Sequence, residues 1–193
     1  MQPESEALSP RRLVRLALVF YAALGAAAVA WRVVIQGQSL WMAPGASVRW
    51  LRDPALGALA AAIVILASAH LSRRSRVGAR LARSLAERLG PLAPHQCWIL
   101  AVASGLAEEA FFRGALQPAI GLVAASAVFA AAHFVPRREL MPWSGFSLAA
   151  GLLLGWLFQV TGNLTAPVVA HVLVNGVNLN RLVREHAGAE PAP

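Results

Sequence analysis

The chain has 193 residues, of which 58% are hydrophobic and only 13% are charged. A soluble domain carries about twice that fraction of charge, so together with a mean hydropathy of +0.57 the composition excludes an ordinary soluble protein. The net charge is +8, and all 17 basic residues are arginine. These arginines lie between apolar segments, where anionic headgroups and the positive-inside rule account for them, so we expect a bilayer and no nucleic acid as partner.

Long apolar runs without alternation predict an all-α fold, a polytopic membrane bundle of about six transmembrane helices with a buried polar site. In chain order, they cover about residues 13–31, 55–71, 96–116, 119–135, 144–160 and 166–182. The first run also resembles a cleavable signal peptide, because three arginines precede it. The acidic residues Glu4 and Glu6 favour a retained helix instead.

Arginine placement predicts the orientation of the bundle. Six arginines stand between the second and third runs: Arg73, Arg74, Arg76, Arg80, Arg83 and Arg88. We therefore expect this segment and both termini to be cytoplasmic, and the membrane to be a bacterial inner membrane. Leu81, Leu85 and Leu89 recur every four residues, which predicts an amphipathic surface helix; a basic loop that only fixes topology is the alternative.

These features divide the chain into three parts. Residues 1–95 form a two-helix membrane segment with a basic cytoplasmic loop, 96–182 form the core that carries the chemistry, and 183–193 are expected to be a disordered tail. The single Cys97 excludes an intrachain disulfide.

The third run contains Glu108, Glu109 and Arg113, three charged residues at membrane depth. Each costs about 2.5–3.5 kcal/mol on insertion scales, so their presence requires a functional reason. On a helix, Glu109 and Arg113 are four residues apart and within ion-pair reach. Glu108 points about 100° away, which leaves it free to act as a general base towards a cavity.

Two later runs supply partners for these carboxylates. Phe129 stands one helical turn before His133, and His171 and Asn175 share one face of the last run. Glu108 with His133 can hold and deprotonate a water molecule that attacks a peptide carbonyl. The side chains of His171 and Asn175 can then stabilise the negative charge on the carbonyl oxygen.

The three patterns together resemble the CPBP family of intramembrane endopeptidases, also called the CAAX protease or Abi family. Its motifs stand here as Glu108-Glu109-x-x-x-Arg113, Phe129-x-x-x-His133 and His171-x-x-x-Asn175, in the family order, and the resemblance covers roughly Leu100 to Asn178. It implies a glutamic-type endopeptidase whose catalytic set is Glu108, Glu109, Arg113, His133, His171 and Asn175. The expected substrate is a membrane-tethered protein or peptide, such as one with a C-terminal processing or sorting signal.

We expect no cofactor. Zinc held by Glu108, His133 and His171 is the alternative, although no His-Glu-x-x-His motif is present. The alternative functions are a non-catalytic membrane scaffold or bacteriocin-immunity-type binding protein, and a proton-coupled carrier.

The predicted boundaries place His133 near the cytoplasmic end of its run and His171 near the opposite end of the last run. A shared site requires similar depth. We therefore expect broken or tilted helices, and four prolines provide a cause: Pro118, Pro136, Pro142 and Pro167.

Overall fold

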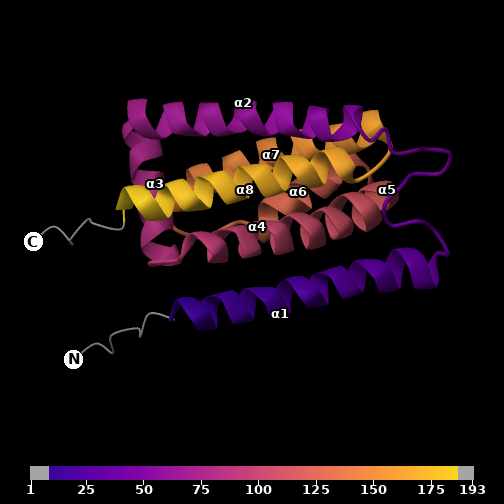
Figure 1. Cartoon of the computed structure of the whole chain (residues 1–193), viewed down its shortest axis with the longest axis horizontal. Helices are drawn as coiled ribbons and strands as arrows, with labels where there is room; N and C mark the ends of the chain where they lie inside the picture. The colour runs from indigo at the N-terminus through magenta and orange to yellow at the C-terminus, as the bar shows by residue number, and fades with distance from the viewer. Residues whose placement is uncertain (1–8, 187–193) are drawn as a thin grey trace, which may run out of the picture.

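The computed structural model describes residues 9–186, which form a bundle of helices (Figure 1). The helices are α1 (Pro10–Val29) with the π-helical η1 (Ala30–Ile35), α2 (Arg52–Arg74), α3 (Arg76–Leu89), α4 (Pro94–Glu109) with the π-helical η2 (Ala110–Leu116), α5 (Gln117–Ile120), α6 (Leu122–Ala132), the 3-10 helix η3 (Arg138–Leu140), α7 (Met141–Thr161) and α8 (Thr165–His186). The described residues contain no β-strand, apart from one isolated bridge between Met42 and Asn163. The predicted all-α class is confirmed.

Within the described range, three helices are long and apolar enough to cross a membrane, which confirms a helical membrane bundle. They are Pro10–Ile35, Arg52–Arg74 and Arg138–Thr161. The other three predicted runs are also helical, but α6 has only 11 residues and α4 carries two glutamates. The count of about six spans therefore stays a prediction.

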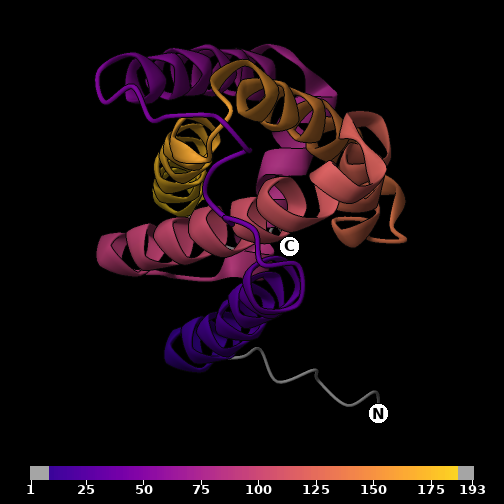
Figure 2. The same cartoon turned by 90° about the vertical axis from the view of Figure 1, so that its right-hand side faces the viewer.

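Helix α8 lies at the centre of the bundle, between α2, α4 and α7 (Figures 1 and 2). Two glycines allow its closest neighbours to approach. A Cβ at Gly57 of α2 would lie 2.4 Å from the Ala166 carbonyl oxygen, and a Cβ at Gly105 of α4 would lie 2.6 Å from Val172 Cγ2. Small residues at these positions bring the polar face of α4 directly against α8.

The fourth predicted run, 119–135, has the wrong boundaries. Gly121 adopts a φ of +83°, a left-handed conformation that favours glycine, and it separates α5 from α6. Helix α6 then ends at Ala132, so its 11 residues rise about 16 Å, roughly half of a hydrocarbon core of about 30 Å. His133 consequently follows a helix that is too short to span such a core.

Helix α3 crosses one end of the bundle at a steep angle to the long helices (Figure 1). Ser75 caps it, because its hydroxyl accepts a hydrogen bond from the Gly78 N–H at 3.3 Å. Ala82 and Ala86 pack against Leu182 of α8, while all the α3 arginines are exposed. The basic segment is thus an amphipathic helix and not an irregular loop.

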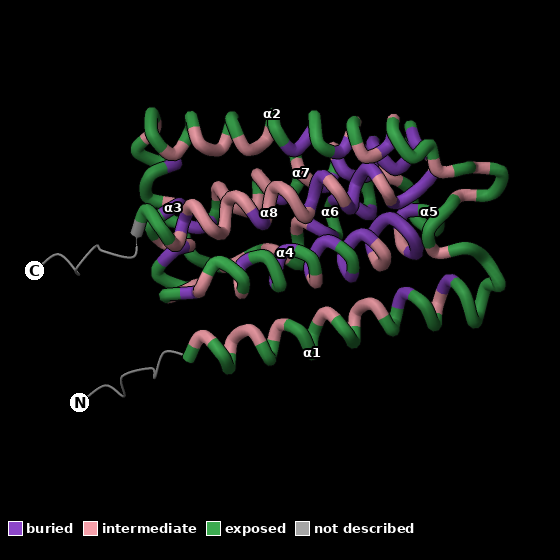
Figure 3. The backbone as a smooth tube through the Cα atoms, viewed as in Figure 1, coloured by how far each residue is buried: buried purple, intermediate pink, exposed green. Residues whose placement is uncertain are grey.

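Helix α1 begins and α8 ends at the same end of the bundle as α3 (Figure 1). Helix α8 continues through His186, so the predicted tail 183–193 begins too early by four residues. The rest of that tail, 187–193, lies outside the described residues. Burial is greatest in α4, α7 and α8, whereas Ala28 is the one buried residue of α1 (Figure 3).

The opposite end of the bundle is closed by the loop between η1 and α2. Its backbone pairs with the turn between α7 and α8: the Leu164 N–H donates to the Trp41 carbonyl at 2.9 Å, and the Ala43 N–H donates to Gly162 at 2.8 Å. Asp53, which is completely buried, fixes this loop. Its carboxylate accepts hydrogen bonds from the Arg49 N–H, the Arg52 Nε and the Asn163 Nδ2 at 2.8–3.0 Å.

Candidate active site

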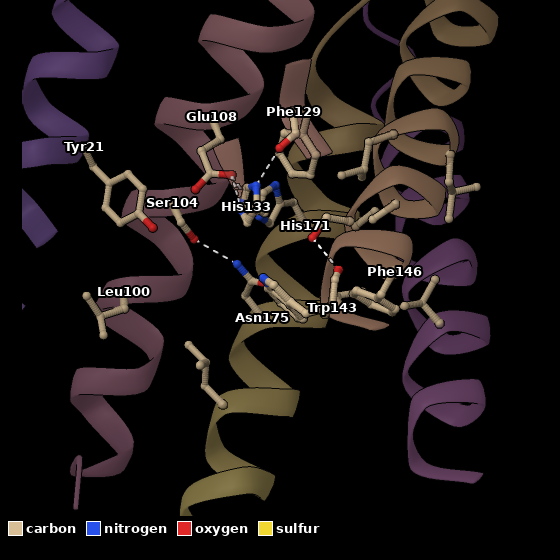
Figure 4. A pocket seen from close by; sticks show the side chains of 18 of the residues that line it. Tyr21, Leu100, Ser104, Glu108, Phe129, His133, Trp143, Phe146, His171 and Asn175 are labelled. Atoms are coloured by element: carbon tan, nitrogen blue, oxygen red, sulfur yellow. Dashed lines mark hydrogen bonds and ion pairs between the residues drawn. The ribbon is translucent and has the colours of Figure 1, made fainter. Parts of the chain in front are cut away.

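The predicted site residues come together from three parts of the fold. Glu108 lies in the last turn of α4, His133 follows α6, and His171 and Asn175 face them from α8 (Figure 4). All four line one cavity of about 330 Å³. The predicted helix boundaries put His133 and His171 at different depths. In the structure α6 ends at Ala132, and both histidines line the same cavity.

Glu108 is 5% exposed, and its Oε2 has no hydrogen-bond partner among the described residues. This oxygen faces two imidazoles: the Nε2 atom of His133 at 3.7 Å and the Nε2 atom of His171 at 4.0 Å. Both distances exceed the range of a direct hydrogen bond. Three polar atoms therefore surround a common point without bonding one another.

His133 is oriented by the helix that precedes it. Its Nδ1 lies 2.8 Å from the carbonyl oxygen of Phe129, one turn earlier. A carbonyl oxygen only accepts, so Nδ1 carries the proton and, in the neutral ring, Nε2 keeps its lone pair. The spacing Phe129-x-x-x-His133 thus aims a hydrogen-bond acceptor at Glu108.

Glu109 is completely buried and holds two partners through one oxygen. Its Oε1 accepts a hydrogen bond from Arg113 Nη1 at 3.2 Å, the pair expected from their spacing, and lies 2.6 Å from His171 Nδ1. The sequence did not predict this second contact. Because an ionised Glu109 accepts from Nδ1–H, it also determines which ring nitrogen of His171 faces Glu108.

Arg113 is 2% exposed and belongs to the π-helix η2, a type of turn frequent at functional sites. Its Nη2 donates to the Gly151 carbonyl at 3.2 Å, which ties α4 to α7. The guanidinium carbon also lies 4.5 Å from the ring centroid of Phe129, and the centroid of the His133 ring lies 4.4 Å from the same ring. Phe129 of the second motif therefore packs against both Arg113 of the first motif and His133.

Asn175 donates through Nδ2 to Ser104 Oγ on α4, at 3.0 Å (Figure 4). Ser104 is itself 3% exposed and donates to the Ala101 carbonyl. Sequence reasoning missed Ser104, because a serine in an apolar helix usually bonds only to its own backbone. Tyr21 of α1 was also missed; its hydroxyl lies against both Glu108 and Ser104.

The cavity is polar at one end only. From Asn175 towards the end of the bundle that carries α3, the cavity is lined by apolar residues of α1, α3 and α8: Leu13, Leu89 and Leu179. Within residues 9–186, no group of three or more His, Cys, Asp or Glu side chains is arranged to hold a metal ion.

Comparison with known proteins gives the same family as the motifs. Residues 90–177 match the family described as Type II CAAX prenyl endopeptidase Rce1-like. The chain is also 44% identical over 82 residues to "Uncharacterized protein YpbD" of Bacillus subtilis (strain 168). That match covers 42% of this chain and 42% of the relative, so the chain spans less than half of the relative's length. No solved structure matches. Residues 90–177 therefore match the CAAX protease (CPBP) family, and the resemblance inferred from the three motifs is confirmed for this segment.

Proposed function

We propose that this chain is a glutamic-type intramembrane endopeptidase that hydrolyses a peptide bond in a membrane-associated protein or peptide. The observation that carries the proposal is the unpaired Oε2 of buried Glu108, which faces two imidazole nitrogens inside a largely apolar cavity. A buried carboxylate oxygen without a partner is costly, so its retention favours a chemical role.

The 3.7 Å separation of Glu108 Oε2 and His133 Nε2 suits a bridging water molecule. Such a water donates one hydrogen to the carboxylate and the other to the imidazole. As its oxygen bonds to the peptide carbonyl carbon, Glu108 accepts the proton. The tetrahedral intermediate then collapses: the C–N bond breaks, and the proton passes from Glu108 to the leaving amine.

The negative charge on the carbonyl oxygen is stabilised by two side chains of α8, His171 and Asn175. Asn175 uses one N–H for Ser104, so its second N–H is available to the oxyanion. His171 already donates from Nδ1 to Glu109, so it donates at Nε2 only as an imidazolium. Ionised Glu109 stabilises that imidazolium, which gives the second glutamate a role in charge stabilisation as well as in pairing with Arg113.

The shape of the cavity supports a membrane-embedded substrate. Its apolar part lies between the polar end and helix α3, which suits an apolar segment that approaches the scissile bond from the basic side of the bundle. We place that side in the cytoplasm, with both termini, because α3 and the end of α2 carry six exposed arginines. A bacterial inner membrane and a C-terminal processing or sorting signal fit this arrangement.

The test compares protein termini in membranes of cells that produce the wild-type chain, Glu108→Ala or His133→Ala. Matched controls are Glu87→Ala and His70→Ala, which change exposed residues of α3 and α2. New termini should arise with the wild type and both controls, and should be missing with both site variants at equal expression. Wild-type termini in the Glu108→Ala cells would refute its assignment as the base. If no membrane protein is cut by the wild type, a binding or scaffold role replaces the protease.

A further inference from the structure

Helix α1 contributes a polar side chain to the site, although it lies far outside the matched segment 90–177. Its contacts with the bundle are chiefly with α4 and η2, and it stands apart from the other helices (Figure 1). From this peripheral helix, Tyr21 points into the cavity towards Glu108 and Ser104 (Figure 4). It is the one tyrosine in the chain.

The Tyr21 hydroxyl points towards two polar side chains, the Glu108 carboxylate and Ser104 (Figure 4). A carboxylate only accepts, and the Ser104 hydrogen is already donated to the Ala101 carbonyl, so the Tyr21 O–H is the donor available to Glu108. Ser104 in turn accepts from Asn175 Nδ2 at 3.0 Å. The base and the amide proposed for the oxyanion therefore lie at the two ends of one row of polar side chains: Glu108, Tyr21, Ser104 and Asn175.

The two oxygens of Glu108 have different surroundings. Oε2 faces His133 and His171, whereas the other oxygen lies on the side of Tyr21 (Figure 4). The terminal torsion of a glutamate is soft, so a carboxylate without a fixed neighbour rotates over a wide range. A donor on one oxygen holds the plane of the group and keeps the other oxygen directed at the two imidazoles.

We propose that Tyr21 is a positioning residue: its hydroxyl fixes the Glu108 carboxylate so that Oε2 is presented to the attacking water. This inference rests on the proposed function, because it assumes that Glu108 is the base. It assigns α1, a helix that the family match does not include, a part in the catalytic step. A tyrosine that served only to fill space would be replaced by phenylalanine without consequence.

The first experiment needs no substrate. The chain is produced with 3-fluorotyrosine and studied in detergent micelles by ¹⁹F NMR, which reports one resonance because the chain has one tyrosine. Glu108→Gln and Ser104→Ala should each shift that resonance, whereas the exposed control Glu87→Gln should leave it unchanged. An unchanged resonance in Glu108→Gln overturns the proposal, whatever the activity of the protein.

The second experiment measures cleavage of a peptide reporter built on a terminus found in the membrane comparison above. Tyr21→Phe should lower kcat by about 10-fold, the loss expected for one hydrogen bond to a charged group, and should leave KM unchanged. Phe20→Leu, on the exposed side of α1, is the control. A second test of coupling is that Tyr21→Phe causes no further loss in a Glu108→Gln background.

The outcomes separate the two proposals. Wild-type kcat in Tyr21→Phe overturns the positioning role and leaves the protease standing. A raised KM with unchanged kcat also overturns it, because that pattern indicates substrate binding. If the wild type cuts nothing, the protease and the positioning role both fail, and the NMR result then describes a structural contact only.

Discussion

Among the buried carboxylates of this bundle, Asp53 and Glu108 differ most in the hydrogen bonds that they accept. Asp53 is fully buried, and both of its oxygens accept hydrogen bonds, from one backbone N–H and two side chains. Glu108 is buried almost as deeply, yet its Oε2 has no partner among the described residues and faces two imidazoles at 3.7 and 4.0 Å. Burial alone does not distinguish them.

The difference lies in whether each carboxylate has an oxygen without a hydrogen bond. Asp53 joins a loop to the turn between α7 and α8, and each of its oxygens already accepts at least one hydrogen bond from the protein. Glu108 has one oxygen, Oε2, that accepts no hydrogen bond, and it lies at the wall of a cavity. Glu109 is intermediate: Oε1 has two partners and Oε2 has none. We therefore expect substitutions of these three acids to separate activity from stability.

The largest effect is expected for Glu108→Gln. Removal of a general base lowers the rate by about 10²–10⁴-fold, while the free energy of unfolding should change by less than about 1 kcal/mol because Oε2 makes no hydrogen bond. Cleavage of the reporter and thermal unfolding in micelles measure the two quantities. A large loss of stability would place Glu108 in the same class as Asp53.

Glu109→Gln should lower both the rate of reporter cleavage and the free energy of unfolding. It leaves the guanidinium of Arg113, which is 2% exposed, without its counter-charge, and removal of one partner from a buried pair costs about 3–5 kcal/mol. Activity should also fall, because His171 loses the anion that orients it. The double variant Glu109→Gln with Arg113→Gln should recover part of the thermal stability and none of the cleavage. Full stability in the single variant would contradict this account.

Asp53→Asn should affect stability alone. The substituted amide presents hydrogens to groups that are themselves donors, so a loss of about 2–4 kcal/mol in the free energy of unfolding is expected. Cleavage below the unfolding midpoint should match that of the wild type. An inactive but stable variant would show that the loop end of the bundle communicates with the site.

The smallest effect is expected from removal of metals. The proposed proton transfers use only side chains, so dialysis against a chelator should leave reporter cleavage unchanged. Loss of cleavage that added Zn²⁺ restores would instead support the zinc site of Glu108, His133 and His171. In that case Glu108→Gln should also abolish zinc binding measured directly by elemental analysis.

The positions of the helices followed largely from the sequence, because apolar runs are a strong pattern. All six predicted runs contain a helix. The contact of Glu109 with Arg113 was also predictable, since it depends on a spacing of four residues within one helix. Local periodicity fixes which residues share a face, and that was sufficient for the three motifs.

Contacts between helices were harder to predict. The bond between Glu109 and His171 joins residues 62 positions apart, and no local pattern specifies it. The short α6 was missed because the apolar run continues through Gly121, although the left-handed glycine ends the helix there. Tyr21 was missed for a related reason: a single hydroxyl in an apolar helix gives no indication of the helix that it will face.

The termination of α6 has a consequence for hydration. The chain leaves α6 after only 11 residues, and from His133 to Arg137 the backbone is irregular, with local hydrogen bonds from the N–H groups of His133, Phe134 and Arg137. Irregular backbone inside a bilayer is tolerated where it is buried in protein or lines a water-filled cavity, so we expect water to reach the proposed site along this connection, beside the imidazole of His133. Each hydrolysis by the proposed protease would consume one water molecule, which this route would replace.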